Sequence, residues 1–179
     1  YGFGDPHFST WDGLLFTFND IGDYVLVQHT KQVQGHPQII IQVRLGKVIG
    51  NRDANASSID AIAVLYNDTK IEYYKNNVIF VNGVKFPIGL LSMNTTLDSK
   101  LYIAYNNSKL ILESLPSKVS LSSFNNTIAV LKHPDSLYCE FSTINGLGVT
   151  AIIISPYSMY KNSEGLLVYW DGSSTNDFF

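Results

Sequence analysis

Residues 59–85 read IDAIAVLYNDTKIEYYKNNVIFVNGVK, and this stretch decides the fold class. Short runs rich in Ile, Val, Tyr and Phe are separated by turn residues at intervals of about 8–12 positions, which is typical of short β-strands joined by hairpins. Asn and Gly tolerate positive φ, so YNDTK, KNNV and VNGVK are expected to form the turns. The stretch therefore predicts a series of antiparallel strands.

The same pattern continues through most of the chain and predicts one all-β domain over residues 1–179, an antiparallel β-sandwich or barrel. We expect strands over 14–20, 23–29, 38–45, 59–66, 70–75, 77–83, 84–89, 101–107, 109–115, 127–133 and 149–155. The continuously apolar runs 38–45 and 149–155 are expected to be central strands, whereas 70–75 and 101–107 alternate and are expected to show one face to water. Only residues 155–165 suggest a short helical turn.

The composition excludes several classes of protein. Of 179 residues, 45% are apolar and 15% are charged, which indicates a foldable chain rather than a disordered one. The net charge of −3 lacks the excess of Lys and Arg that is typical of a nucleic-acid-binding protein. No apolar run approaches the roughly 18 residues that span a membrane. Without an initiator Met or a signal peptide, the chain is expected to be excised from a larger protein.

The cysteine and asparagine residues of the chain indicate in which cellular compartment the protein is expected. The lone Cys139 cannot form an internal disulfide; it is either a small buried apolar residue or the partner of a segment outside this chain. Five Asn-x-Ser/Thr sequons stand where turns are expected, and they favour an extracellular glycoprotein. The candidate glycan acceptors are Asn55, Asn67, Asn94, Asn106 and Asn125.

The segment GDPH, residues 4–7, holds the parts of a self-cleaving bond. The Asp5 carboxylate can attack its own carbonyl carbon and form a cyclic anhydride, because the leaving nitrogen belongs to Pro6 and is a readily protonated tertiary amide. His7 can deliver that proton near neutral pH. Gly4 permits strained backbone geometry. The alternative interpretation is a turn in which proline fixes φ.

The end of the chain, GLLVYWDGSSTNDFF, is rich in side-chain oxygens. Asp171, Asn176 and Asp177 lie around a turn at Gly172, and hard oxygen ligands on a tight loop suit Ca²⁺. The loop cannot fill a calcium shell alone, and Asp12 in WDG is the candidate for a further carboxylate. The alternative is a solvated Asp-Gly turn.

The two ends together resemble one family. GDPHFSTWDGLLFTFNDIGDYVLV is similar to the opening of a von Willebrand factor type D domain, with Gly-Asp-Pro-His, then aromatic-Asp-Gly, then a strand. EGLLVYWDGSSTNDFF resembles the closing signature of that family. The middle of the chain is similar to the cysteine-poor branch, which occurs in transmembrane mucins and in sushi-domain surface proteins beside AMOP and nidogen-like domains.

The resemblance implies a sandwich of antiparallel sheets and a Ca²⁺ site that joins the two ends. By position, the side chains of Asp12, Asp171, Asn176 and Asp177 and the carbonyl of Ser173 would be its ligands. Some members of the family cleave the Asp-Pro bond of Gly-Asp-Pro-His spontaneously, so the resemblance also implies cleavage at Asp5–Pro6.

The chain departs from the family pattern in its closing signature and its cysteines. Val168 and Tyr169 replace the usual Gly-Asn, which removes an amide ligand, and Asn176 replaces the first of two paired acids. These changes predict weakened calcium binding. Leu167 stands where the clotting-factor branch has Cys, so disulfide-linked multimers are not expected through this domain.

We therefore expect a non-enzymatic structural or adhesion module of a mucin-like or cell-surface glycoprotein. Its expected partners are neighbouring domains of the same polypeptide and other extracellular proteins or glycans, with no nucleic acid and no membrane span in the segment. Two alternatives are a lipid-carrier-associated D-type domain and a metal hydrolase using Asp5, His7, Asp12 and Asp171. The aromatic residues define no binding patch.

Overall fold

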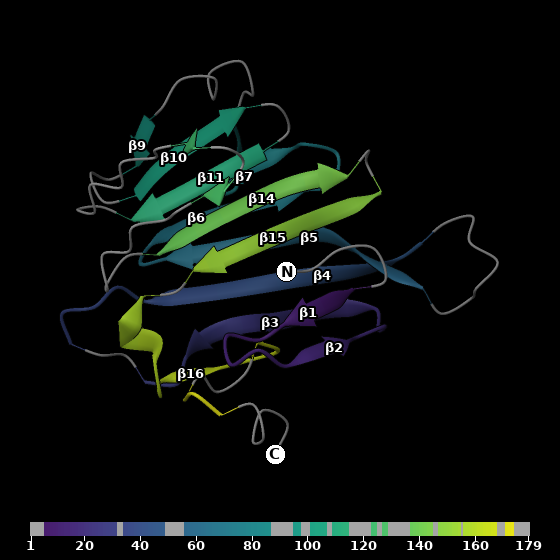
Figure 1. Cartoon of the computed structure of the whole chain (residues 1–179). Coiled ribbons are helices and arrows are strands. Elements are labelled where there is room, and N and C mark those ends of the chain that lie inside the picture. The colour runs from purple at the N-terminus through teal and green to yellow at the C-terminus, as the bar shows by residue number, and fades with distance from the viewer. Residues whose placement is uncertain are drawn as a thin grey trace.

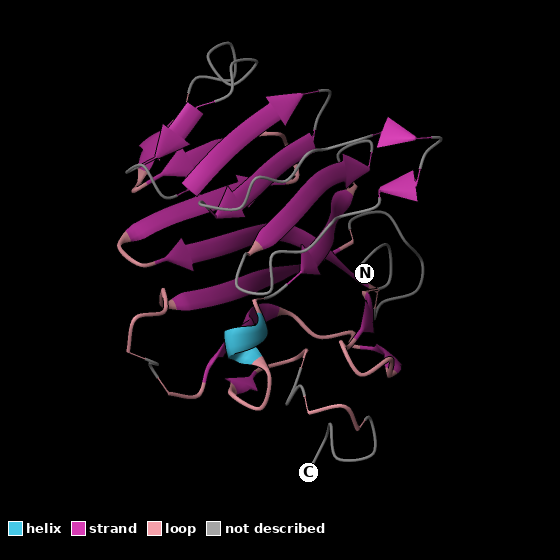
Figure 2. Ribbon diagram, turned by 60° about the vertical axis from the view of Figure 1, so that its left-hand side comes forward, coloured by secondary structure: helices cyan, strands magenta, loops and turns pink. Residues whose placement is uncertain are grey.

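The computed structural model describes residues 6–31, 34–48, 56–86, 95–97, 101–106, 109–114, 123–124, 127–128, 137–144, 147–154, 156–167 and 171–173. Antiparallel strands make up nearly all of the regular structure in these ranges. A 3₁₀ turn, η1, spans Tyr157–Met159 (Figure 2). The all-β fold and the short helical turn within 155–165 are confirmed. No helix in the described ranges has the length and apolar character needed to cross a bilayer.

One sheet contains the stretch that decided the fold class. Within the described residues it has seven strands in the order β16-β3-β4-β5-β6-β7-β8. Asn67, Asn77 and Asn82 have φ of 52°, 61° and 50° in the turns between β5 and β8, as expected of Asn in tight hairpins. The strands are β3 Gly22–His29, β4 Ile39–Lys47, β5 Ser57–Tyr66, β6 Thr69–Tyr74, β7 Ile79–Val81, β8 Val84–Lys85 and β16 Ser163–Glu164.

A second sheet faces the first, and β15 packs against β5. Its order in the described residues is β15-β14-β11-β10-β9. Two small hairpins, β1–β2 (Figure 1) and β12–β13, complete the described strands. These strands are β1 His7–Ser9, β2 Leu15–Thr17, β9 Thr95–Leu97, β10 Leu101–Asn106, β11 Lys109–Ser114, β12 Ser123–Phe124, β13 Thr127–Ile128, β14 Tyr138–Ile144 and β15 Gly148–Ile154.

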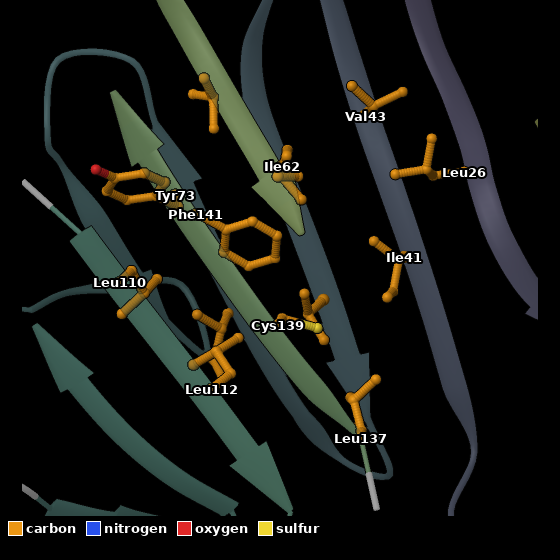
Figure 3. Close-up of a cluster of buried hydrophobic side chains, with 14 of the residues drawn as sticks. Leu26, Ile41, Val43, Ile62, Tyr73, Leu110, Leu112, Leu137, Cys139 and Phe141 are labelled. Carbon is orange, nitrogen blue, oxygen red and sulfur yellow. The ribbon is translucent and has the colours of Figure 1, made fainter. Parts of the chain in front are cut away.

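The core lies between the two sheets, where alternate side chains of each strand meet (Figure 3). Ile41 and Ile62 of the first sheet are 0% and 1% exposed. The rings of Tyr73 and Phe141, one from each sheet, stack with their centroids 6.4 Å apart. Cys139 is 0% exposed in the same core, which agrees with its interpretation as a small buried residue.

Two details of the strand prediction need correction. Residues 149–155 were expected to be a central strand, but among the described strands β15 pairs with β14 alone and lies at the edge of its sheet. The run is apolar on both faces because one face meets the core and the other is half-buried. The sequence analysis also did not assign β14, although Leu137, Cys139 and Phe141 alternate there with Tyr138 and Glu140.

A β-bulge in β3 prepares the attachment of the end of the chain. The register with β4 shifts between Val25 and Val27, so Leu26 is the extra residue. The carbonyl groups of Val25 and Leu26 accept hydrogen bonds from the N–H groups of Leu166 and Leu167, at 2.9 and 2.8 Å. The bulge therefore holds the closing segment against the first sheet.

Candidate functional site

The closing segment can lie against β3 because Gly165 has no side chain. Its φ of +128° lies in the region that favours glycine. A Cβ at this position would stand 2.8 Å from the carbonyl oxygen of Leu26 and 2.9 Å from that of Val25. The close backbone contact places the residues that follow Gly165 beside the β1–β2 hairpin.

The turn between β1 and β2 is closed by its own hydrogen bonds. The N–H of Thr10 donates to the carbonyl of Leu14 at 2.9 Å, and the N–H of Leu14 donates to Thr10 Oγ1 at 3.0 Å. Gly13 has a φ of 88°, which allows the tight Asp-Gly turn. These bonds fix the position of Asp12 at the tip of the turn.

Asp12 joins the beginning of the chain to its closing loop. Its Oδ2 accepts a hydrogen bond from the N–H of Asp171 at 3.2 Å, and its Oδ1 accepts one from the N–H of Gly172 at 3.0 Å. A carboxylate that accepts two adjacent backbone N–H groups acts as a cap for the loop. The structure thus brings together the two acidic turns that the sequence analysis paired.

Asp171 organises the loop from the other side. Its Oδ1 accepts the N–H of Ser173 at 2.9 Å, which makes a small Asx-type turn with Gly172 at a φ of 92°. The hydroxyl of Tyr160 donates to the Asp171 carbonyl at 2.7 Å. Tyr160 follows η1, so the loop is held by the start of the chain and by the segment after β15.

The described residues include two of the side chains that the sequence analysis named as calcium ligands, Asp12 and Asp171. A carboxylate offers about four acceptor positions, so Asp12 can hold two N–H groups and still coordinate a cation. The hard oxygens of Asp12 and Asp171 suit Ca²⁺. No group of three His, Cys, Asp or Glu side chains with metal-binding proximity occurs among the described residues. A complete shell would need Asn176, Asp177 and carbonyl groups such as that of Ser173, and Asn176 and Asp177 lie outside the described ranges.

The cleavage motif is described only on the C-terminal side of its bond. Asp5 lies outside the described residues. The carbonyl of Pro6 accepts the N–H of Phe18 at 3.1 Å, so Pro6 is held at the start of β1. The ring of His7 is exposed, and its Nδ1 lies 2.7 Å from Thr17 Oγ1. The ring of His7, the residue that follows Pro6 in the motif, is therefore oriented by its hydrogen bond with Thr17.

Trp11 is a residue of this region to which the sequence analysis gave no role. Its indole Nε1 donates to the carbonyl of Ile153 in β15 at 3.3 Å. This bond links the β1–β2 turn to the edge of the second sheet, one position before Asp12. The sequence feature that could have indicated this role is the aromatic residue before Asp-Gly, because a buried indole N–H usually finds a hydrogen-bond acceptor.

Two of the five candidate acceptors, Asn67 and Asn106, lie within the described residues. Asn67 occupies the turn between β5 and β6, where its Oδ1 accepts the N–H of Gln38 at 3.0 Å. Asn106 is the last residue of β10. The other three candidate acceptors, Asn55, Asn94 and Asn125, lie outside the described residues.

The alternative functions gain no support from the described residues. A lipid carrier needs a large cavity, but Tyr73, Phe141 and their neighbours fill the described core between the sheets. A groove beside β15 measures about 210 Å³, below the roughly 300 Å³ at which small-molecule pockets begin. Of the acids proposed for a hydrolase, Asp12 and Asp171 accept backbone N–H groups, and Asp5 lies outside the described residues.

Comparisons with known proteins agree with the fold. The chain is similar to mouse mucin-4, with 27% identity over 98% of this chain and 5% of the mouse protein. Human mucin-4 is 26% identical over 98% of this chain, which corresponds to 3% of the human protein. Human mucin-5AC is 48% identical over 40 residues, or 22% of this chain. The chain thus spans only a small part of these mucins.

A family model supplies the assignment. The model of the von Willebrand factor type D domain matches residues 1–140, which include Gly-Asp-Pro-His and the Asp12 turn. The closing loop with Asp171 follows the matched region, and the similarity to mucin-4 extends over it. The chain belongs to the von Willebrand factor type D domain family.

Proposed function

We propose that this domain is a non-enzymatic extracellular module of a mucin-like or cell-surface glycoprotein, stapled by calcium and self-cleaved at Asp5–Pro6. The observation that carries the proposal is the Asp12 carboxylate, which binds the closing loop at Asp171 and Gly172. A structural module needs its ends held together, and the mucin relatives support an extracellular setting. Neighbouring domains, extracellular proteins and glycans are its proposed partners.

Calcium binding is proposed at the junction of the two ends. Asp12, Asp171, Asn176 and Asp177 would supply side-chain oxygens, and Ser173 a carbonyl. The cation would relieve repulsion among the carboxylates, which favours binding to the folded state over the unfolded chain. The two N–H groups on Asp12 leave its remaining acceptor positions for the ion.

A thermal-unfolding experiment tests the calcium proposal. Calcium at roughly millimolar concentration is expected to raise the melting temperature, by an amount that grows with the ratio of calcium to Kd. Asp177→Ala should abolish the shift, whereas the control Asp68→Ala should retain it, because Asp68 is exposed in the β5–β6 turn. Equal melting temperatures with calcium and with a chelator would refute this part of the proposal.

The proposed cleavage uses only groups of the chain and water. The Asp5 carboxylate attacks the Asp5 carbonyl carbon, the bond to the Pro6 nitrogen breaks, and that nitrogen takes a proton from His7. Water then opens the cyclic anhydride to give a C-terminal Asp5 and an N-terminal Pro6. The hydrogen bond between His7 and Thr17 orients the His7 ring, and the N–H of Phe18, which donates to the Pro6 carbonyl, holds Pro6 as the leaving group.

Intact-mass measurement tests cleavage on a protein that extends upstream of Tyr1. The expected result is two masses that correspond to a break after Asp5 and a single mass in Asp5→Ala. Thr17→Val, which removes the hydroxyl beside His7, is expected to slow the break, while Thr30→Val at a remote strand end serves as the control. One uncut mass at both mildly acidic and neutral pH would rule cleavage out.

A further inference from the structure

The outer face of the first sheet carries a polar hollow over its central strand. β5 is the fourth of the seven described strands and lies between β4 and β6. The side chains of Val43 and Ile62 point into the core between the sheets (Figure 3), so those of their neighbours along each strand point to the opposite, outer face. A hollow of about 230 Å³ lies there over β5, and we call it the β5 hollow.

Two alanine residues form the floor of the β5 hollow. Ala61 and Ala63 occupy consecutive outward positions of β5. Alanine is depleted in strands, and the outward positions of a central strand more often carry β-branched or aromatic side chains that pack with their cross-strand neighbours. The two alanine residues therefore reduce the packing on this face and leave room above β5. Such an exception to a local rule is expected at functional sites.

Long polar side chains form the two walls of the β5 hollow. The wall on β4 consists of Gln42 and Arg44, and the wall on β6 consists of Glu72 and Tyr74. These residues pair in register with the two alanine residues of the floor. Neighbouring strands are about 4.8 Å apart, so the two walls rise from backbones about 10 Å apart. The volume is below the roughly 300 Å³ of pockets for drug-sized ligands, so the hollow fits one small ring.

The charged groups of the β5 hollow are paired with one another. Arg44 Nε donates to Asp23 Oδ1 at 2.7 Å, and Arg44 Nη2 donates to Asp23 Oδ2 at 2.9 Å. Lys70 Nζ lies 3.1 Å from Glu72 Oε1. Among the described lining residues, the two cations and the two anions therefore cancel. Because a charged ligand would compete with one of these pairs, the hollow complements a neutral ligand.

The rim of the β5 hollow keeps both donors and acceptors for a ligand. The guanidinium of Arg44 has five N–H donors, and Asp23 accepts only two of them. Within the described part of the chain, the amide of Gln42 and the hydroxyl of Tyr74 have no hydrogen-bond partner. A mixed set of this kind suits a polyol, because each hydroxyl group both donates and accepts hydrogen bonds.

An aromatic pair gives the β6 wall an apolar surface. The ring of Tyr74 packs edge-to-face with that of Phe80, and their centroids are 5.7 Å apart. This contact holds the Tyr74 ring in place beside the floor. A sugar ring has hydroxyl groups at its edge and C–H groups on its faces, so it matches polar walls combined with an aromatic surface.

We propose that the β5 hollow binds one neutral saccharide unit of a glycan. Gln42, Arg44 and Glu72 form hydrogen bonds with its hydroxyl groups, and Tyr74 contacts one face of its ring. The inference rests on the proposed function, in which glycans are partners of an extracellular module, and names the site of that contact. A site for one small ring gives a Kd on the order of 1 mM, and many copies of the saccharide on one glycoprotein raise the overall affinity.

An amide NMR titration of the 179-residue chain tests the ligand class. The probes are the methyl glycosides of galactose, glucose, mannose and N-acetylgalactosamine, with N-acetylneuraminic acid as the charged comparison. At least one neutral glycoside should cause saturable shifts in residues 42–44, 61–63 and 70–74, and the charged sugar should bind about tenfold more weakly. No saturable shift with any neutral glycoside, or equal binding of the charged sugar, would overturn the proposal.

Two substitutions test the position of the site. Ala63→Leu fills the floor with a side chain that the next outward position, Leu65, already carries, and it should abolish the shifts. Ala104→Leu makes the same change at a half-buried position of the second sheet and should retain them. Gln42→Ala should weaken binding several-fold, whereas Gln38→Ala, outside the hollow, should not. Unchanged binding in Gln42→Ala and in a folded Ala63→Leu would overturn the assignment.

A glycopeptide distinguishes a saccharide on a protein from a free sugar. A peptide that carries several copies of the bound saccharide should bind more tightly than its methyl glycoside, and enzymatic removal of the saccharide should abolish binding. Equal affinities would assign the hollow to free sugars and would refute the glycan. These outcomes are separate from the calcium test, because Asp177 does not line the hollow: a missing calcium response would refute only the calcium proposal.

Discussion

The carboxylate of Asp12 and the backbone N–H of Asp171 form a hydrogen bond of 3.2 Å across a sequence separation of 159 residues. The neighbouring N–H of Gly172 binds the other oxygen of the same carboxylate. The bulge at Leu26 and the missing side chain of Gly165 bring the closing segment close enough for this contact. The contact between the two ends therefore depends on the first sheet, which positions the closing segment, as well as on the Asp12 carboxylate, which binds it.

Removing the Asp12 carboxylate is expected to destabilise the domain. Asp12→Ala leaves two loop N–H groups without their acceptor and should lower the free energy of unfolding by about 1–3 kcal/mol. Asp12→Asn keeps one oxygen and should lose less. Urea denaturation without calcium measures both, with Asp68→Ala as the control. Identical stabilities of Asp12→Ala and the control would show that the loop is held by other contacts.

Gly165→Ala is expected to be more damaging than a glycine substitution in an open turn. The Cβ would contact two carbonyl oxygens of β3, and the positive φ adds about 1–3 kcal/mol of strain. Gly13→Ala is the matched control, because Gly13 also has a positive φ but nothing lies within 4 Å of its added Cβ. Thermal unfolding should show the larger decrease for Gly165→Ala, and equal decreases would contradict the close contact.

The stability of the domain is expected to fall at mildly acidic pH through His29. Burial, and then the charge of nearby His36, lower the pKa of His29 from its usual 6.5. Its buried Nε2 has no hydrogen-bond partner in the described structure. A base whose pKa is lower in the folded state stabilises the fold fully above about pH 6.5, and this contribution is lost as pH falls through the folded pKa.

Denaturation at several pH values measures this effect. His29→Gln should flatten the decrease of unfolding free energy below about pH 6.5, because it removes the group whose pKa is lower in the folded state. A decrease of the same steepness in His29→Gln would assign the acid sensitivity to other groups.

Cys139 is expected to be unreactive in the folded domain. Its side chain is 0% exposed, and desolvation raises the pKa of the thiol, which suppresses the reactive thiolate. A maleimide reagent should label the protein only after denaturation, as measured by intact mass. Rapid labelling of the native protein would contradict the burial, and an unlabelled denatured protein would indicate that Cys139 is oxidised.

The sequence predicted the fold class and most strands because local signals were strong. The Asn-rich turns between β5 and β8 have the positive φ that the residue types indicated. The edge position of β15 was not predictable from its apolar run, because strand order depends on which partners a strand meets and not on its own composition. β14 was missed although the sequence carries a period-two signal for it, with Leu137 just before the strand, Cys139 and Phe141 in the core, and Glu140 between them.

At the candidate site, the residue types indicated that the acidic turns at Asp12 and Asp171 could lie together, and the resemblance of both ends to one family implied that they do. The residue types and the resemblance did not indicate which hydrogen bonds join the two turns. Asp12 accepts hydrogen bonds from backbone N–H groups. Because almost every residue type has the same backbone N–H group, the sequence does not indicate which residues donate. The roles of Trp11 and Tyr160 were missed for the same reason, since both donate to carbonyl groups of distant segments.

The contact between Asp12 and the Asp171 loop also has a mechanical consequence, because it joins two segments 159 residues apart in the sequence. Tension applied through segments adjoining the two turns would pull on this contact first, while the long ladders of β3, β4 and β5 lie outside the direct path. Under constant force, the hydrogen bonds between Asp12 and the Asp171 loop would break first, and the domain would lengthen there while the strands of both sheets stay paired. Because these hydrogen bonds can form again when the force is removed, the lengthening of the stretched polypeptide at this contact would be reversible.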